Sequence, residues 1–148
     1  MECITTAKMK ELEAKNASLG LTYGEMMDHA GRHAAQVDLD RYAPVGKRVL
    51  ALCGRGNNGG DGLVSALALA RAGAAVAAAL PLGEPATPQA KEALVRLEEY
   101  GAVPVTTQPE EIFRAIAGAD LILDCLFGTG FGGEVSPQVR RLMEAVDR

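Results

Sequence analysis

Four side chains with amide or carboxylate oxygens stand out, because they occupy two glycine-rich stretches of the chain. Asn57, Asn58 and Asp61 lie in the first stretch, GRGNNGGDG, and Asp124 opens the second, DCLFGTGFGGE. A set of oxygen donors without thiolates or imidazoles suits a hard cation, or a ligand rich in hydroxyl groups. The competing interpretation is that these residues only cap a helix and shape a turn. Two such stretches at one place are harder to explain by turns alone, so we predict a small-molecule site.

The first stretch also carries a glycine pattern associated with nucleotide binding. Gly54, Gly56 and Gly59 form G-x-G-x-x-G between an apolar run and a predicted helix, which is the dinucleotide fingerprint but a weak signal by itself. The Lys-Ser/Thr ending of a Walker P-loop is missing, since glycine and leucine follow Asp61. A carboxylate at Asp61 would also repel a pyrophosphate bound to the same helix N-terminus. The pattern therefore argues against a plain pyrophosphate site.

Histidine and cysteine offer no comparable set. His29 and His33 are four positions apart, as zinc-binding histidines on a helix can be, but further ligands at matching spacing are missing. We interpret the pair as solvated or packed side chains. Cys53 and Cys125 share no C-x-x-C spacing and are interpreted as small buried residues beside the site. This cysteine usage favours a reducing compartment, so we predict a cytoplasmic protein.

Alternating strands and helices provide the frame for these residues. Apolar runs predict strands at 48–53, 75–80, 103–106 and 119–125, and periodicity predicts helices at 6–16, 22–37, 62–72, 89–100, 109–118 and 138–148. The second helix begins with Thr22 and Glu25 at the spacing of a capping box. Gly31 within that helix indicates a close approach by another part of the backbone.

This order of elements predicts the fold class. Strands that alternate with helices form a mostly parallel sheet with right-handed crossovers, so we expect an α/β, Rossmann-like, doubly wound fold with two N-terminal helices. In the usual strand order 3-2-1-4, the first and fourth strands are neighbours at the point where the winding reverses, and ligands bind there beyond the carboxyl ends of the strands. Residues 54–62 and 124–134 leave the sheet at that edge. The two glycine-rich stretches are therefore expected to converge.

Length and composition limit the classes of protein that remain. The chain has 148 residues, of which 48% are hydrophobic and 23% charged, as expected of one globular domain. Its net charge is −4 and runs of Lys or Arg stop at two residues, so a nucleic-acid surface is not indicated. Apolar stretches stay below the roughly 18 residues of a membrane span, and the N-terminus lacks the apolar core of a signal peptide. We expect a soluble protein whose partner is a small molecule, with no nucleic acid and no membrane.

At these residues the chain resembles a known family. GRGNNGGDGLVSALALARAG and LILDCLFGTGFGGE are similar to the two signature motifs of the YjeF N-terminal domain, the NAD(P)H-hydrate epimerases, and MMDHAG resembles that family's M-E-N-A-G segment. The resemblance covers nearly all of residues 1–148. It implies a nucleotide-binding isomerase of metabolite repair that interconverts the two epimers of hydrated NADH or NADPH. It is also compatible with a homodimer.

The resemblance assigns roles to both stretches. The residues implied in substrate binding are Asn57, Asn58, Gly59, Gly60 and Asp61 from the first stretch, and Gly128, Thr129, Gly130, Phe131, Gly132, Gly133 and Glu134 from the second. Backbone N–H groups of the second stretch would wrap phosphates or ribose. The implied cofactor is a potassium ion, K⁺, with Asn58 and Asp124 as its ligands. Two departures from the family pattern are His29, where M-E-N-A-G has asparagine, and Arg55, where the family often has proline.

The two stretches do not supply an obvious catalytic acid. Epimerisation by loss and return of water, or by ring opening, needs a carboxylic acid or carboxylate near the reacting carbon. The resemblance implies that this group is the aspartate of a D-x-P-S-G motif, which we expect beyond Arg148. The domain is then incomplete at its C-terminus, and we expect weak or no turnover from this chain alone.

Two other functions stay open from the sequence. One is a non-catalytic YjeF-like binding or scaffold module, which exposed apolar edges and tight self-association would favour. The other is an ordinary Rossmann nucleotide-binding domain, in which Glu84 beyond the second strand would bind a ribose hydroxyl. NAD binding that survives the loss of Asn58 and Asp124 would identify the second of these.

Overall fold

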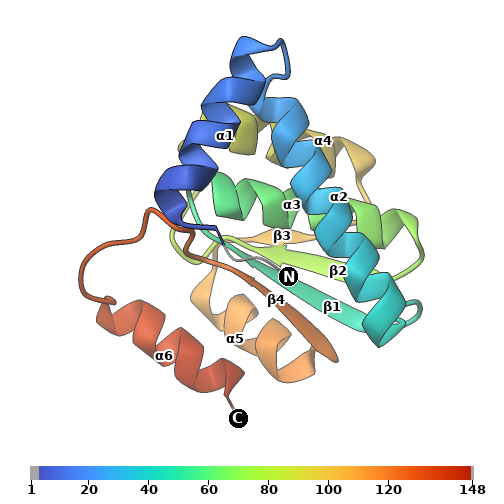
Figure 1. Ribbon diagram of the computed structural model, residues 1–148. Helices are drawn as coiled ribbons and strands as arrows, with labels where there is room; N and C mark the ends of the chain where they lie inside the picture. The colour runs from blue at the N-terminus through green and yellow to red at the C-terminus, as the bar shows by residue number, and fades with distance from the viewer. Residues whose placement is uncertain (1–3, 148) are drawn as a thin grey trace.

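A parallel sheet covered by helices on both faces forms the centre of the molecule, in a computed structural model that describes residues 4–147 (Figure 1). The elements in chain order are α1 (Thr6–Ser18), α2 (Tyr23–Tyr42), β1 (Arg48–Cys53), α3 (Asn57–Arg71), β2 (Ala75–Ala79), α4 (Pro88–Tyr100), β3 (Val105–Thr106), α5 (Pro109–Gly118), β4 (Leu121–Cys125) and α6 (Pro137–Val146). Cys3 and Arg148 lie outside the described residues. The predicted α/β class, with two helices before the first strand, is confirmed.

The sheet has four parallel strands in the order β3-β2-β1-β4. This is the predicted order, and it makes β1 and β4 neighbours although about 70 residues separate them in the chain. β1 is central because Val49–Cys53 is an apolar run that can be buried on both faces. β3 is an edge strand, as Pro104 predicted, and it is shorter than expected because Pro104 has no N–H to donate to a ladder.

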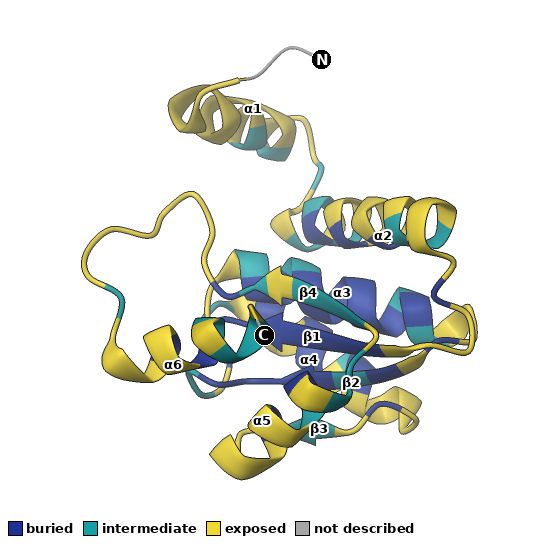
Figure 2. Ribbon diagram, turned by 90° about the horizontal axis from the view of Figure 1, so that it is seen from below, coloured by how far each residue is buried: buried dark blue, intermediate teal, exposed yellow. Residues whose placement is uncertain are grey.

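Two layers of helices cover the sheet. Alternate side chains of β1 divide between two apolar clusters, with Val49, Ala51 and Cys53 facing α2, α3 and α4. Leu50 and Leu52 face α5 and α6 on the other side. Figure 2 shows the buried residues gathered along the sheet and along the inner sides of the helices. The candidate site residues at the ends of β1 and β4 are therefore held by strands that are packed on both faces.

The close approach predicted at Gly31 is confirmed. A Cβ atom at this position would lie 2.6 Å from Val64 Cβ and 2.7 Å from the backbone oxygen of Asp61, so α2 and α3 can cross here only because residue 31 is glycine. The buried Ser65 hydroxyl of α3 donates a hydrogen bond of 2.8 Å to the Gly31 carbonyl. This crossing fixes the first turns of α3, which carry several of the candidate site residues.

The helix α1 lies away from the sheet and has no buried residue (Figure 2). Thr5 caps its first turn and Gly20, with φ of 100°, follows its end. The capping box predicted for Thr22 and Glu25 is present at the start of α2. None of the helices described between residues 4 and 147 is long and apolar enough to cross a membrane.

Two helix boundaries differ clearly from the sequence prediction. The helix α3 begins at Asn57, five positions before the predicted start at Gly62. Asparagine and glycine are poor helix formers, but here packing against α2, α4 and the sheet edge outweighs their intrinsic propensity. The helix α2 continues to Tyr42, five positions beyond the predicted end, because Leu39 packs against the core. The remaining boundaries agree within two residues, which is the usual uncertainty of helix and strand ends.

Candidate functional site

The two glycine-rich stretches meet at the carboxyl edge of the sheet, between β1 and β4. Cys53 and Cys125 are paired across these strands, and the backbone N–H of Gly54 continues the ladder with a 3.0 Å hydrogen bond to the Cys125 carbonyl. The first stretch then turns at once into α3, and the second leaves as an extended loop towards α6 (Figure 1). This is the switch point at which open α/β sheets bind ligands.

Glycine is required where β1 turns into α3. A Cβ atom on Gly59 would lie 1.8 Å from the backbone oxygen of Gly54, and one on Gly54 would lie 1.9 Å from the backbone oxygen of Leu126. Three backbone segments therefore touch without intervening side chains. The G-x-G-x-x-G pattern serves this close contact, which places the N-terminus of α3 directly beside the end of β4.

Asn58 joins the two stretches through its side chain. Its Nδ2 group donates a 3.1 Å hydrogen bond to the carbonyl of Phe127, and its Cβ lies 3.1 Å from where a Cβ of Gly128 would stand. Asn57 is exposed at the first position of the same helix. The predicted convergence of residues 54–62 with the start of the second stretch is thus present in the structure.

Asp61 occupies a half-buried position directly after the first turn of α3, beside that turn as predicted. Burial, together with the nearby carboxylate of Glu13 from α1, raises the pKa of Asp61 to about 6. The backbone oxygen of Asp61 accepts a hydrogen bond from Ser65. Asp61 is therefore a carboxyl group that can hold or release a proton near neutral pH.

Asp124 is exposed at the end of β4 and shapes the turn that follows. Its Oδ1 accepts a 3.1 Å hydrogen bond from the backbone N–H of Leu126. Ile122 packs on the α5 and α6 side of the sheet, and alternation along the strand directs Asp124 to that side. Asn58 approaches from α3 on the other side, and no hydrogen bond between residues 4 and 147 joins the two side chains. Both residues lie at the same edge of the sheet.

The residues from Gly128 to Glu134 form an exposed loop. Its backbone turns between Gly128 and Phe131, where the Phe131 N–H donates a 3.0 Å hydrogen bond to the Gly128 carbonyl. The rings of Phe127 and Phe131 pack together with centroids 4.1 Å apart. An exposed aromatic pair at the rim of a ligand site supplies a surface against which a planar ring can pack.

The oxygens of Asn58 and Asp124 suit a hard cation. Within residues 4–147 no group donates to Asn58 Oδ1 or to the second carboxylate oxygen of Asp124, so both are available as ligands. Hard cations take such amide and carboxylate oxygens. In the same part of the chain no three His, Cys, Asp or Glu side chains gather into a metal site. His29 and His33 lie exposed on α2, in agreement with their interpretation as solvated side chains.

The two cysteines face the helix α3. Cys53 is fully buried, while Cys125 is half-buried and lies against Gly62. Burial raises the pKa of both thiols, that of Cys125 to about 12. Neither is suited to act as a thiolate nucleophile, as their interpretation as packing residues requires.

Sequence reasoning missed three residues at this edge. Glu13 of α1 contributes to the raised pKa of Asp61, which no local pattern indicates. Arg55 links the loop between β2 and α4 to the first stretch. Its Nε donates a 3.1 Å hydrogen bond to the carbonyl of Glu84, and its own carbonyl accepts a 2.8 Å hydrogen bond from the Ala86 N–H. Leu126 is the close backbone neighbour of Gly54. The departure from the family pattern at Arg55 was the only sequence signal for any of them.

Comparison with known proteins identifies the family of this chain. A family model described as YjeF-related protein N-terminus matches residues 23–148. The "Bifunctional NAD(P)H-hydrate repair enzyme Nnr" of Thermanaerovibrio acidaminovorans is 39% identical over 140 residues, which cover 93% of this chain and 27% of that protein. The "NAD(P)H-hydrate epimerase" of Elusimicrobium minutum is 31% identical over 157 aligned positions, which cover 99% of this chain and 70% of that protein. The chain thus spans about a quarter of the length of the bifunctional relative.

A solved structure agrees with the fold. The crystal structure of the yeast protein ynu0 superposes with a TM-score of 0.82 at 23% identity, over 98% of this chain and 65% of that one. Given the family match from the start of α2 onward and a relative 31% identical over nearly the whole chain, this protein belongs to the YjeF-related N-terminal family.

Proposed function

We propose that this chain binds hydrated NADH or NADPH at the carboxyl edge of its sheet and interconverts the two epimers of the hydrate. The observation that carries the proposal is the Asn58–Phe127 hydrogen bond, which joins the two glycine-rich stretches at one edge of the sheet. Relatives named NAD(P)H-hydrate epimerase support it, among them one from Cenarchaeum symbiosum that is 36% identical over 135 residues. No other class of function is favoured by these similarities.

The two stretches would bind different parts of the substrate. Residues 57–61 present amide and carboxylate oxygens that can bind ribose hydroxyls or the hydrated ring. Residues 128–134 form an exposed glycine-rich loop whose N–H groups can bind phosphate oxygens. The ring pair of Phe127 and Phe131 would pack against one face of a base.

We propose that potassium binds between Asn58 and Asp124, whose available oxygens fit a hard cation. The ion would supply a fixed positive charge beside the anionic phosphates of the substrate. Asn58 would keep its Nδ2 on Phe127 while its Oδ1 serves as a ligand. The chain's own contribution is to hold both oxygens at the strand ends.

Proton transfer requires a carboxyl group that is not fully ionised near neutral pH. Among the described residues of the crevice, Asp61 fits this requirement because its pKa is raised to about 6. The aspartate of D-x-P-S-G, which we expect from the family, does not occur in residues 1–148. Ligand binding is therefore the primary test, with turnover as the second measurement.

The experiment measures binding of the hydrate to the 148-residue chain by calorimetry, in potassium chloride and in N-methylglucamine chloride of equal ionic strength. We expect tighter binding with potassium and a loss of about tenfold in affinity for Asn58→Ala, equivalent to one charge-assisted contact. Asn16→Ala, which changes an exposed asparagine on α1, is the matched control and should bind as the parent does. Melting temperatures confirm that the variants are folded.

Epimer interconversion is followed in the same samples by chromatography of the two hydrates. Turnover that depends on potassium and is lost in Asp124→Asn supports the site as proposed. NAD binding as tight as hydrate binding, and unaffected by loss of Asn58 and Asp124, would instead identify an ordinary nucleotide-binding domain and overturn the proposal. Robust turnover of the same rate with and without potassium would refute the cation site.

A further inference from the structure

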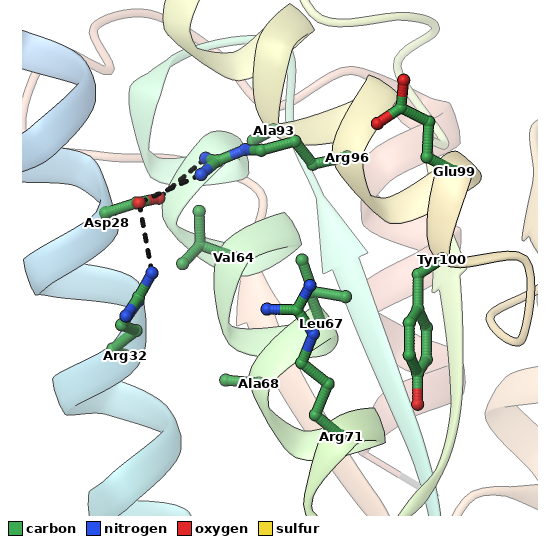
Figure 3. Close-up of a pocket in the computed structure, with 10 residues that line it drawn as sticks. All are labelled: Asp28, Arg32, Val64, Leu67, Ala68, Arg71, Ala93, Arg96, Glu99 and Tyr100. Atoms are coloured by element: carbon green, nitrogen blue, oxygen red, sulfur yellow. Dashed lines mark hydrogen bonds and ion pairs between the residues drawn. The ribbon is translucent and has the colours of Figure 1, made fainter.

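A second recess lies on the helical face of the molecule, away from the carboxyl edge of the sheet. It opens between α2, α3 and α4 and has a volume of about 250 Å³ (Figure 3). Its part of α3 begins at Val64, beyond the stretch that carries Asn57 and Asn58. The recess is therefore distinct from the proposed hydrate site, and the inference does not rest on that function.

Three arginines from three different helices surround this recess, which we call the arginine groove. Arg32 comes from α2, Arg71 from α3 and Arg96 from α4, and Figure 3 shows their side chains directed into the space between the helices. The chain as a whole has a net charge of −4, so three guanidinium groups at one place form a local exception. Guanidinium groups present planar pairs of N–H donors that match phosphate and carboxylate oxygens.

One carboxylate within the groove already accepts hydrogen bonds from an arginine. Asp28 accepts two hydrogen bonds from Arg96, of 3.0 and 2.7 Å, and these hold its pKa below the usual range. Arg32 reaches the same carboxylate only at 3.5 Å, the limit of a hydrogen bond. The second acid on the groove, Glu99, points away from the other side chains in Figure 3. Asp28 thus balances one of the three positive charges.

Arg71 is held in place without an anionic partner. Its guanidinium carbon lies 5.7 Å from the centroid of the Tyr100 ring, a cation–π contact. Within residues 4–147 it forms no ion pair and no side-chain hydrogen bond. Its N–H donors therefore remain free beside the groove, while stacking on the ring limits the conformations of the side chain.

Arg96 adds one further donor that the protein does not satisfy. Its Nε is enclosed, and none of the described residues accepts a hydrogen bond from it. An enclosed polar group without a partner is unfavourable, so an acceptor that enters the groove and lets the guanidinium turn towards it would relieve this. Each of the three arginines therefore has N–H groups in the groove that could donate a hydrogen bond to a ligand.

We propose that the arginine groove binds the phosphate group of a small molecule. Among the described residues Arg71 lacks a carboxylate partner and Arg32 reaches Asp28 only at 3.5 Å, which favours a dianion over a carboxylate of single charge. The volume exceeds what a lone phosphate needs, and Tyr100 at the wall offers a ring against which an attached organic group can pack. Free phosphate and an organic phosphate monoester share this chemistry.

The test is a titration of the ¹⁵N-labelled 148-residue chain with inorganic phosphate and, separately, with AMP, followed by amide shifts in NMR spectra. Acetate and chloride at equal ionic strength are the reference anions. We expect saturable shifts at residues 64–71 and 93–100 for both phosphates. Tighter binding of AMP would identify an organic monoester as the ligand, and equal affinity would identify the free ion.

Variants distinguish phosphate binding at this groove from attraction to general surface charge. Arg71→Gln is expected to raise the dissociation constant about tenfold or more, and Arg71→Lys to have a smaller effect because it keeps the charge but loses the planar donors. Arg114→Gln removes another exposed arginine, from α5 on the opposite face, and should leave the affinity unchanged. The melting temperature confirms folding of each variant.

Three results would overturn the proposal. The first is an affinity for phosphate that Arg71→Gln leaves unchanged. The second is a set of linear shifts that acetate or chloride reproduces. The third is binding of AMP that maps only to residues 57–61 and 128–134, since it would place the phosphate at the carboxyl edge of the sheet.

Discussion

The close contact between Gly59 and Gly54 predicts opposite effects for two glycine-to-alanine substitutions. Gly59 and Gly24 both lie in the first turn of a helix, α3 and α2 respectively. Intrinsic helix propensity alone predicts that alanine stabilises either position by up to about 1 kcal/mol. The packing of the two positions differs, however, and we expect Gly59→Ala to destabilise the protein while Gly24→Ala stabilises it.

The size of the effect follows from the space around each position. A Cβ on Gly59 would lie 1.8 Å from the Gly54 oxygen, and backbone atoms cannot rotate away as a flexible side chain can. The start of α3 must therefore move by roughly 1 Å or more. Overpacking of this kind typically costs about 1–3 kcal/mol, more than the gain in helix propensity. A Cβ on Gly24 meets nothing closer than 4.0 Å, so its gain is not opposed.

Urea unfolding followed by circular dichroism measures both free energies. A change of 1 kcal/mol corresponds to roughly 2–4 °C in melting temperature for a domain near this size, so thermal unfolding is an independent check. Movement of α3 should also weaken the Asn58–Phe127 bond, and hydrate binding by Gly59→Ala should fall with it. A Gly59→Ala protein as stable as Gly24→Ala would show that the Gly54–Gly59 backbone contact does not hold the two glycine-rich stretches together.

Three further substitutions test individual charged groups. The raised pKa of about 6 makes the ionised form of Asp61 unfavourable in the folded protein. Asp61→Asn should therefore be more stable than the parent above pH 6, and the difference should vanish below about pH 4. Urea titrations at several pH values measure this difference. Asp120 is the opposite case, since hydrogen bonds from Arg48 lower its pKa to about 2; Asp120→Asn should be less stable than the parent at neutral pH, and the difference should shrink as the pH falls towards 2. Asp28→Ala removes both hydrogen bonds that Arg96 donates and should reduce the free energy of unfolding by about 1–3 kcal/mol. An unchanged value would show that this link between α2 and α4 contributes nothing.

The fold was predictable because local pattern and global arrangement agree along most of the chain. The apolar run from Val49 to Cys53 indicated a central strand, and Pro104 indicated an edge. The main error was the start of α3, where Asn57 and its neighbours have low helix propensity. Tertiary contacts at Gly60 and Gly62 stabilise those turns, and such contacts between distant segments leave no periodic signal in the sequence.

The candidate site was predictable in its position but not in its electrostatics. Convergence of the two stretches follows from strand order alone, which is why Asn58 was expected near the start of the second stretch. The raised pKa of Asp61 depends on burial and on Glu13, which approaches from a helix about 50 residues earlier in the chain. No spacing rule connects Glu13 with Asp61, so the sequence could indicate Asp61 as a candidate site residue but not that its pKa is raised.

The proposed hydrate site and the arginine groove use different parts of α3, the groove beginning at Val64. Asn57 is the first residue of this helix and Arg71 the last, so their backbones are about 20 Å apart at a rise of 1.5 Å per residue. A phosphate bound at Arg71 would therefore be remote from Asn57 and Asn58, and an influence of one on the other would pass through a shift of the helix itself. Ser65, bonded to Gly31 of α2 between the two ends, opposes such a shift. We therefore expect Asn58→Ala to leave the affinity of the groove for phosphate unchanged. A changed affinity would show that α3 moves as a unit. Thermodynamic linkage would then require bound phosphate to alter the affinity for the hydrate by the same factor.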